Sequence, residues 1–139
     1  MILADTSAWV EYDRATGSSV DTRLSDLISA NDNIAVTEPV MMEVLAGARD
    51  EERASDLRRL LLRFHLLRFD PIADFEGAAR LYRKCRSSGI TPRGMVDCMI
   101  ATVALRTRAT LLAHDVDMSR IADVVGIDLD HASTGNITS

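Results

Sequence analysis

Acidic residues stand at the ends of apolar runs in this sequence. Asp5 follows Ile2-Leu3-Ala4, and Asp115 and Asp117 follow the apolar run 110–113. A short apolar run that ends in polar residues and continues as helix-forming sequence is typical of a buried parallel strand leading into a helix. Because ligands bind beyond the carboxyl ends of such strands, Asp5 and Asp115 are candidate site residues. The alternative for Asp5 is that it only caps the following helix.

Two further acids lie in predicted helices. Glu43 stands among large apolar residues in a helix expected over about 38–47, where a buried carboxylate must be paired or bind a metal. Alternatively, Glu43 lies on a narrow exposed stripe of that helix. Asp97 lies in the first turn of an almost wholly apolar helix, about 95–106. It either interacts with the helix dipole or projects into a cleft.

Four carboxylates that met in one cleft would have only His114 nearby to neutralise them. Their mutual repulsion is costly unless a divalent cation resides there. Oxygen ligands suit Mg²⁺, for which Mn²⁺ can substitute, and clustered carboxylates typically support metal-assisted phosphoryl chemistry. The residues therefore predict hydrolysis of a phosphate ester, without naming the ester.

Alternating strand and helix signals predict an α/β fold with a parallel sheet. Strands are expected over 2–4, 34–36, 66–69, 110–113 and 127–129. Helices are expected over about 8–16, 20–28, 38–47, 50–64, 73–88, 95–106 and 118–125. In the helix 73–88, Phe75, Ala78, Ala79 and Tyr82 are predicted to face inward. We expect the chain to form one domain, 1–132, followed by a polar tail, 133–139.

Composition narrows the function classes. At 139 residues, with 47% hydrophobic and 27% charged residues, the chain fits one globular domain. A net charge of −5 argues against a general polyanion-binding surface, although it leaves room for a local one. With no signal-peptide pattern and no stretch of membrane-spanning length, we expect a cytoplasmic protein without membrane contact. The two cysteines and three histidines show no zinc-site spacing.

Four segments together resemble a known family. They are Asp5 to Glu11, Glu38 to Gly47, Asp97 to Ala101 and His114 to Met118. In this order and spacing they resemble PIN-domain ribonucleases, specifically the VapC toxins of bacterial VapBC toxin–antitoxin systems. The resemblance spans the chain from Met1 to about Leu129. The sequence departs from the family at Met118, where Phe is usual, and at Asp13, where an apolar residue is common. The charge of Asp13 puts in doubt whether the partner-binding surface is the same as in the family.

The resemblance implies a three-layer α/β/α PIN-like domain with a central parallel sheet. It also implies an Mg²⁺-dependent endoribonuclease that cleaves structured RNA such as tRNA, a homodimer, and a neutralising VapB-like antitoxin. In the mechanism we expect, Glu43 orients or deprotonates the attacking water. The catalytic acids that the resemblance implies are Asp5, Glu43, Asp97 and Asp115. The metal ligands that it implies are Asp5, Asp97, Asp115 and Asp117, with Thr6 as a supporting residue.

Recognition of RNA by an acidic protein requires local positive charge. Arg86 and Arg93 bracket the loop that leads to Asp97, so they are the predicted RNA contacts. One alternative is a catalytically inactive PIN-like scaffold that binds a protein partner. A receiver or phosphatase-like protein is less consistent with the sequence, since it would need a Lys after a late strand or an Asp-x-Asp motif after the first.

Overall fold

A parallel four-stranded sheet forms the centre of the molecule. The structure is a computed structural model that describes residues 1–133. The strands are β1 (Ile2–Ala4), β2 (Ile34–Val36), β3 (His65–Leu66) and β4 (Thr110–Leu112), in the order β3-β2-β1-β4. All three pairings are parallel, and Leu3 of β1 lies opposite Ala35 on one side and Leu111 on the other. The carboxyl ends of the strands therefore share one edge.

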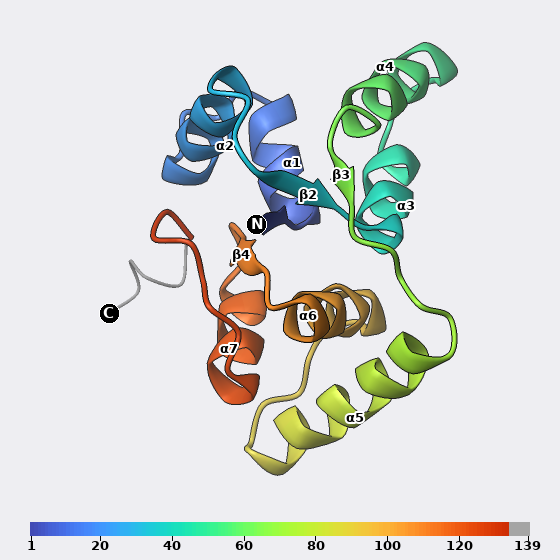
Figure 1. Ribbon diagram of the computed structural model, residues 1–139, viewed down its shortest axis with the longest axis vertical. Helices are drawn as coiled ribbons and strands as arrows, with labels where there is room; N and C mark the ends of the chain where they lie inside the picture. The colour runs from blue at the N-terminus through green and yellow to red at the C-terminus, as the bar shows by residue number, and fades with distance from the viewer. Residues whose placement is uncertain (134–139) are drawn as a thin grey trace.

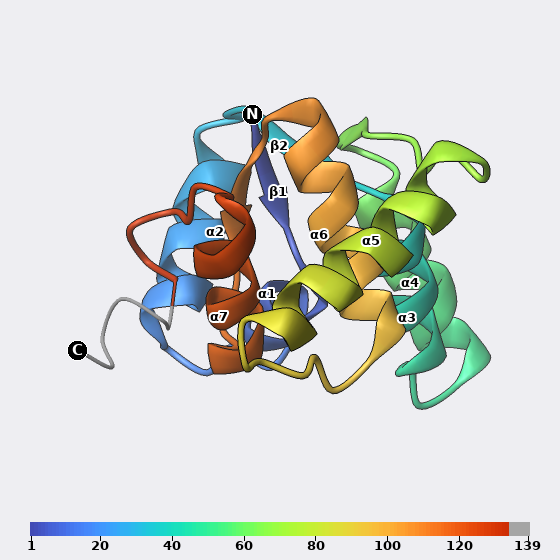
Figure 2. The same ribbon diagram turned by 90° about the horizontal axis from the view of Figure 1, so that it is seen from below.

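Helices cover both faces of this sheet, as the two ribbon views show (Figures 1 and 2). They are α1 (Thr6–Asp13), α2 (Ser19–Ser29), α3 (Glu38–Ala46), α4 (Glu51–Leu61), α5 (Ala73–Ser87), α6 (Met95–Thr107) and α7 (Val116–Val125). Helices α1 and α2 lie on one face, and α6 and α7 lie on the other with α5 packed outside them. Helices α3 and α4 flank the β2–β3 side. This is the three-layer α/β/α architecture expected from the sequence.

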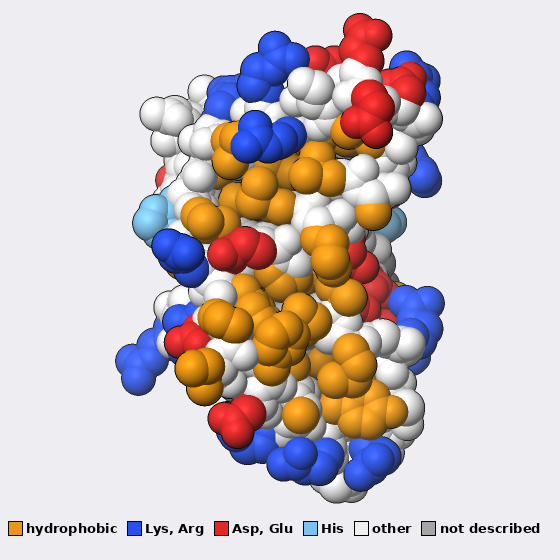
Figure 3. Space-filling model, turned by 90° about the vertical axis from the view of Figure 1, so that its right-hand side faces the viewer, with side chains coloured by type: hydrophobic (Ala, Val, Ile, Leu, Met, Phe, Trp, Pro, Cys, Tyr) orange, Lys and Arg blue, Asp and Glu red, His pale blue; other side chains and the backbone are white. Residues whose placement is uncertain are grey.

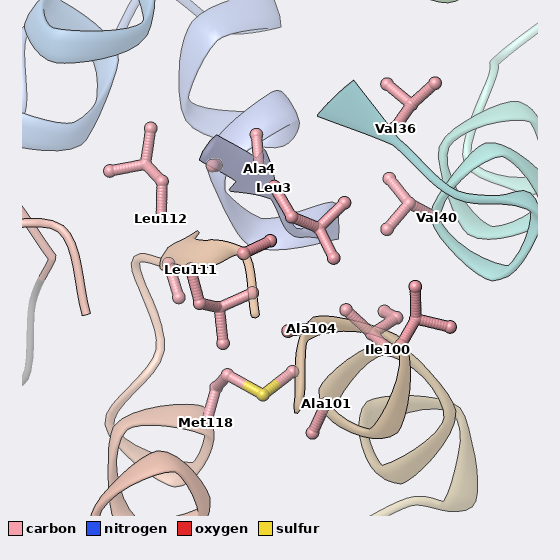
Figure 4. Packing of buried hydrophobic residues seen from close by; sticks show 14 of the residues in the cluster. Leu3, Ala4, Val36, Val40, Ile100, Ala101, Ala104, Leu111, Leu112 and Met118 are labelled. Atoms are coloured by element: carbon pink, nitrogen blue, oxygen red, sulfur yellow. The ribbon is translucent and has the colours of Figure 1, made fainter. Parts of the chain in front are cut away.

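One part of the core fills the space between the sheet and α6, and another part includes Trp9 of α1 and Leu24 of α2. Figure 4 shows Leu3 of β1 and Leu111 of β4 directed toward α6, whose Ile100, Ala101 and Ala104 face them. All of these side chains are buried, which explains why α6 is apolar nearly all round. Met118 extends from α7 into the same core and is fully buried, so the family's usual Phe is replaced here by another large apolar residue.

Short polar side chains fix where several helices begin. Asp5 caps α1, Ser18 caps α2, Asp50 caps α4 and Asp115 caps α7, each by accepting a backbone N–H of the first turn. Two of these caps are the acids that end β1 and follow β4. Capping and a role in the site are therefore compatible for Asp5, rather than alternatives.

Three expectations about elements were wrong. The third strand is His65–Leu66 rather than 66–69, although Leu67 still donates to the Val36 carbonyl at 2.7 Å. Residues 127–129 form a single bridge, between Leu129 and Leu111, instead of a strand. Phe75 is 55% exposed, because the buried face of α5 runs through Gly77, Ala78, Leu81 and Cys85.

Helix α5 lies close to α6 at that buried face. A Cβ built on Gly77 would lie 2.5 Å from Oγ1 of Thr102 on α6, so only glycine permits this approach. An ion pair holds the two helices together elsewhere: Arg106 of α6 donates to both carboxylate oxygens of the buried Asp74, at 2.9 and 2.7 Å.

The chain returns to β4 near its end. Ser133 is fully buried, where it donates to the Leu111 carbonyl and accepts the Ala113 N–H. The rest of the expected polar tail, 134–139, lies outside the described residues. Among residues 1–133, every helix is too short or too polar to cross a membrane.

Candidate active site

Asp5 is at the centre of the carboxyl edge of the sheet. It directly follows β1, is only 2% exposed, and its Oδ1 accepts the Ala8 N–H at 3.0 Å. The pKa of Asp5 is raised to about 7, first by burial and also by the negative charges of Asp97 and Asp115, which together outweigh the hydrogen bonds that the carboxylate accepts. Such a carboxyl group is costly to ionise unless positive charge approaches it.

Ser7 joins the ends of the two central strands, a role that the sequence analysis missed. Its hydroxyl donates to Oδ1 of Asp5 at 2.6 Å and accepts the backbone N–H of His114 at 2.8 Å. Because His114 follows β4 and Asp5 follows β1, this one hydroxyl fixes the Asp5 carboxylate relative to the segment that carries Asp115. The only sequence signal for it is a hydroxyl two residues after a strand-end acid.

Glu43 enters the site from α3. Its half-buried side chain accepts a hydrogen bond at Oε1 from the Thr6 hydroxyl, at 2.5 Å. Thr6 is the first residue of α1, so the bond crosses from one helix to another at the carboxyl edge of the sheet. The predicted partnership of Thr6 with the acid cluster is therefore present, and Glu43 does not point away into solvent.

Asp97 lies on the first turn of α6 and is half-buried. The pKa of Asp97 is raised to about 6, first by burial and then by the charges of Asp115, Glu43 and Asp117. The Arg93 guanidinium acts in the opposite direction on that pKa. Asp97 thus interacts electrostatically with each of the other three predicted catalytic acids.

Asp115 and Asp117 form the remaining part of the cluster, and Arg93 contacts both. The Arg93 Nη2 donates to Oδ1 of Asp115 at 2.9 Å, and its Nε lies 3.8 Å from Oδ2 of Asp117. The Arg93 backbone N–H also donates to that Asp117 oxygen, at 3.2 Å. Asp115 in turn accepts the Asp117 N–H at 3.0 Å. Arg93 is therefore part of the acid cluster, whereas the sequence placed it only on the flanking loop.

Arg86 is in a different environment from Arg93. Its guanidinium carbon lies 5.8 Å from the centre of the Tyr82 ring, one turn back on α5. Within the described residues no ion pair links Arg86 to the acid cluster. The two arginines that the sequence analysis treated alike thus have distinct surroundings.

The donor set fits a divalent cation of the Mg²⁺ type. Asp5, Asp97, Asp115 and Asp117 supply carboxylate oxygens alone, the ligands such ions prefer. The pKa values of Asp5 and Asp97 are raised first by burial and then by neighbouring negative charge, so a bound cation would favour their ionised forms. Among residues 1–133, no three acidic, histidine or cysteine side chains lie close enough, as arranged, to hold one ion together. Binding thus requires side chains of the cluster to move.

Comparison with known proteins agrees with this fold and cluster. A model of the PIN domain matches residues 2–124. The chain is 42% identical over 128 residues to the VapC ribonuclease Mb1587 of Mycobacterium bovis and to ribonuclease VapC11 of Mycobacterium tuberculosis, covering 91% of this chain and 96% of each relative.

Solved structures share the architecture at lower sequence identity. VapBC2 from Rickettsia felis, bound to a DNA fragment from its promoter, aligns with a TM-score of 0.73 at 21% identity, over 94% of this chain and 98% of that one. VapC20 of Mycobacterium tuberculosis, a toxin that cleaves the sarcin–ricin loop, aligns with a TM-score of 0.67 at 17% identity, over 86% and 93%.

An acid cluster at the carboxyl edge of this three-layer fold defines a PIN-domain nuclease. The chain belongs to the PIN-domain family, within its VapC ribonucleases. The family predicted from the sequence is confirmed, and so is the class of enzyme, an endoribonuclease.

Proposed function

We propose that the chain is the toxin of a VapBC-type pair and cleaves structured RNA by divalent-metal-dependent hydrolysis in the cytoplasm. The observation that carries the proposal is the cluster of four carboxylates at one sheet edge, in which Asp97 interacts with each of the other three and two have raised pKa values. An inactive scaffold has no need to retain such an unfavourable arrangement. A tRNA or a ribosomal loop presents the single-stranded bases that a narrow acid-lined site could take.

Each acid has a distinct role in this proposal. Asp5, Asp97 and Asp115 hold the cation, Mg²⁺ or Mn²⁺, and Asp117 supports them by orienting Asp115 through its backbone N–H. A bound cation would supply a water of lowered pKa and would offset the charge that develops on the scissile phosphate. Ser7 fixes the direction of the Asp5 carboxylate.

Glu43 is the proposed base. Its Oε1 is engaged by the Thr6 hydroxyl, so Oε2 is the oxygen that accepts a proton from the attacking water. Because water attacks rather than the ribose 2′-hydroxyl, the products carry a 5′-phosphate and a 3′-hydroxyl. Phosphate contact by Arg86 and Arg93 belongs to the same proposal, although the pairing of Arg93 with Asp115 means that its guanidinium is not simply available.

The groove beside Glu43 is the proposed seat of a VapB-like antitoxin. It has a volume of about 540 Å³ and lies between α1, α3 and α4, with Trp9, Val44 and Leu57 among its lining residues. Asp13, the departure from the family pattern, also lines it and pairs with Arg53 there. An antitoxin segment in this groove would contact Glu43 directly and so block the base.

The proposed homodimer uses the exposed apolar face on the α3 and α5 side. Figure 3 shows hydrophobic side chains gathered over this side of the molecule, with charged residues at its two ends. The large exposed apolar residues on these elements and the segments beside them are Met42, Leu62, Leu66, Ile72 and Phe75. An apolar surface of this kind is typical of an interface rather than of a monomer's free surface.

The test is metal-dependent cleavage of RNA. A mixture of cellular RNA should be cut in Mg²⁺ or Mn²⁺ and left intact with excess chelator. Asp97→Asn should lower the cleavage rate by about two orders of magnitude, the usual cost of losing a principal charge stabiliser. Asp26→Asn, which changes an exposed acid of α2, is the matched control. Cleavage that persists in chelator would reject the metal mechanism. An Asp97→Asn loss of about tenfold or less would instead limit Asp97 to a helix-capping role.

A further inference from the structure

Arg93 places a positively charged guanidinium within the acid cluster. The Arg93 guanidinium contacts Asp115 at 2.9 Å and approaches Asp117 at 3.8 Å, and it lowers the pKa of Asp97. One arginine side chain therefore acts on three of the acids that the proposed function assigns to the site. A divalent cation bound there would need the same carboxylate oxygens.

The backbone and side chain of Arg93 have separable roles. The backbone N–H donates to Oδ2 of Asp117 and holds the loop against the start of α7, whatever side chain is present. Pro92, the preceding residue, is buried and anchors the loop from the other side. Only the guanidinium depends on arginine. Removing it should therefore leave the loop and the Asp117 carboxylate in place.

The exposure of the Arg93 side chain allows it to move away from the acid cluster. It is 73% exposed, while its acidic partners Asp115 and Asp117 are 19% and 10% exposed. An ion pair with one exposed member contributes little net free energy, because water solvates the freed charge well. The acids, in contrast, are held in place by helix capping and by neighbouring hydrogen bonds.

We infer that the Arg93 guanidinium is an internal counterion of the acid cluster, which competes with the divalent cation for Asp115 and moves toward solvent when the cation binds. The inference rests on the proposed function, whose metal site it regulates. Arg93 thereby sets the metal affinity below what the carboxylates alone would give. The freed guanidinium would then be available to a phosphate group of the substrate.

Mn²⁺ binding, measured by calorimetry without RNA, tests the competition. Arg93→Ala should bind Mn²⁺ about two- to fivefold more tightly than wild type, the range expected for an exposed ion pair. Arg93→Lys should lie between them, since it keeps the charge but loses the planar fork. Arg86→Ala removes an equal charge outside the cluster and should match wild type. Raising the ionic strength should narrow the Arg93→Ala difference.

A second measurement follows the guanidinium directly. The side-chain Nε–H resonance of Arg93, assigned as the signal that Arg93→Ala lacks, should shift during a Mg²⁺ titration with the midpoint of metal binding. An unchanged resonance, or Arg93→Ala binding Mn²⁺ no more tightly than wild type while Asp97→Asn still abolishes binding, would overturn the counterion role and leave the metal site standing. Absence of Mn²⁺ binding in wild type and in every Arg93 variant would overturn both.

Discussion

Thr6 donates a 2.5 Å hydrogen bond to Oε1 of Glu43, which lies 37 residues further along the chain. The bond connects the first residue of α1 to the middle of α3, and it occupies one carboxylate oxygen of Glu43. The other oxygen is then the one that can act as a base. Thr6 is thus a positioning residue, which acts on the reaction through Glu43.

Thr6→Val should lower kcat by about tenfold with little change in KM, because partners that orient a reacting group typically contribute ten- to a hundredfold. Valine keeps the shape of threonine and removes only the donor. Thr6→Ser restores the hydroxyl and should recover most of the rate. Steady-state cleavage of one RNA by the three proteins decides the matter: a serine variant as slow as the valine variant would show that Thr6 matters for packing and not for its hydrogen bond.

Ser7→Ala should move metal binding to higher pH. The Ser7 hydrogen bond lowers the pKa of Asp5, so its loss raises that pKa further above about 7, and a cation binds only the ionised carboxylate. The loss also costs about 1 kcal/mol of stability, since the His114 N–H loses its acceptor. Mn²⁺ affinity measured across the neutral pH range tests this. Ser25→Ala, which removes a serine–aspartate bond on α2, is the control; equal pH profiles for all three proteins would contradict the prediction.

The metal-free protein should lose stability as the pH rises from about 4 to about 7. The pKa of Asp5 is about 7 in the folded protein, against an ordinary value of 3.8, so in this window the folded state retains a proton that the unfolded state has released. The free energy of unfolding therefore falls with rising pH, by at most about 1.4 kcal/mol per pH unit for this group.

Asp5→Asn removes this titration while keeping an oxygen that can cap α1. Urea unfolding in chelator, at several values between about pH 4 and about pH 8, should show a shallower fall for Asp5→Asn than for wild type. The contribution of Asp97, whose pKa of about 6 acts in the same direction, should remain. A variant whose stability falls as steeply as that of wild type would mean that Asp5 is already ionised in the folded protein.

The sequence was sufficient to predict β1, β2 and β4 and the acids that follow β1 and β4. An apolar run such as Ile2–Ala4 that ends in Asp5 has few alternatives to a buried parallel strand, and the same pattern recurs before Asp115. The positions of Asp97 and Glu43 in helices also followed from local composition. These predictions depend on short stretches of chain, where periodicity and capping preferences decide the structure.

Features that depend on contacts across the chain were not predictable in the same way. The pairing of Arg93 with Asp115 joins residues 22 positions apart, and the contact of Ser7 with His114 joins residues 107 apart. The wrong placement of Phe75 on the buried face of α5 has a similar cause, whereas Ala78 is buried as predicted. The close approach of α6 at Gly77, which selects the buried face, has no local signal in the sequence.

Phe75→Lys should convert the proposed homodimer into a monomer. Phe75 is 55% exposed and packs edge-on against Phe69 at 4.8 Å between ring centres, so the two rings together form an apolar surface at the start of α5. A buried aromatic at an interface contributes about 2 kcal/mol or more, and its loss weakens association at least about thirtyfold. Sedimentation at micromolar concentration should show a dimer for wild type and for the α2 control Asp26→Lys, and a monomer for Phe75→Lys. Because the Phe75 side chain is exposed in the isolated protomer, Phe75→Lys should keep its fold, which thermal unfolding checks. A monomeric wild type would contradict the dimer itself, and a dimeric Phe75→Lys would place the interface on another face.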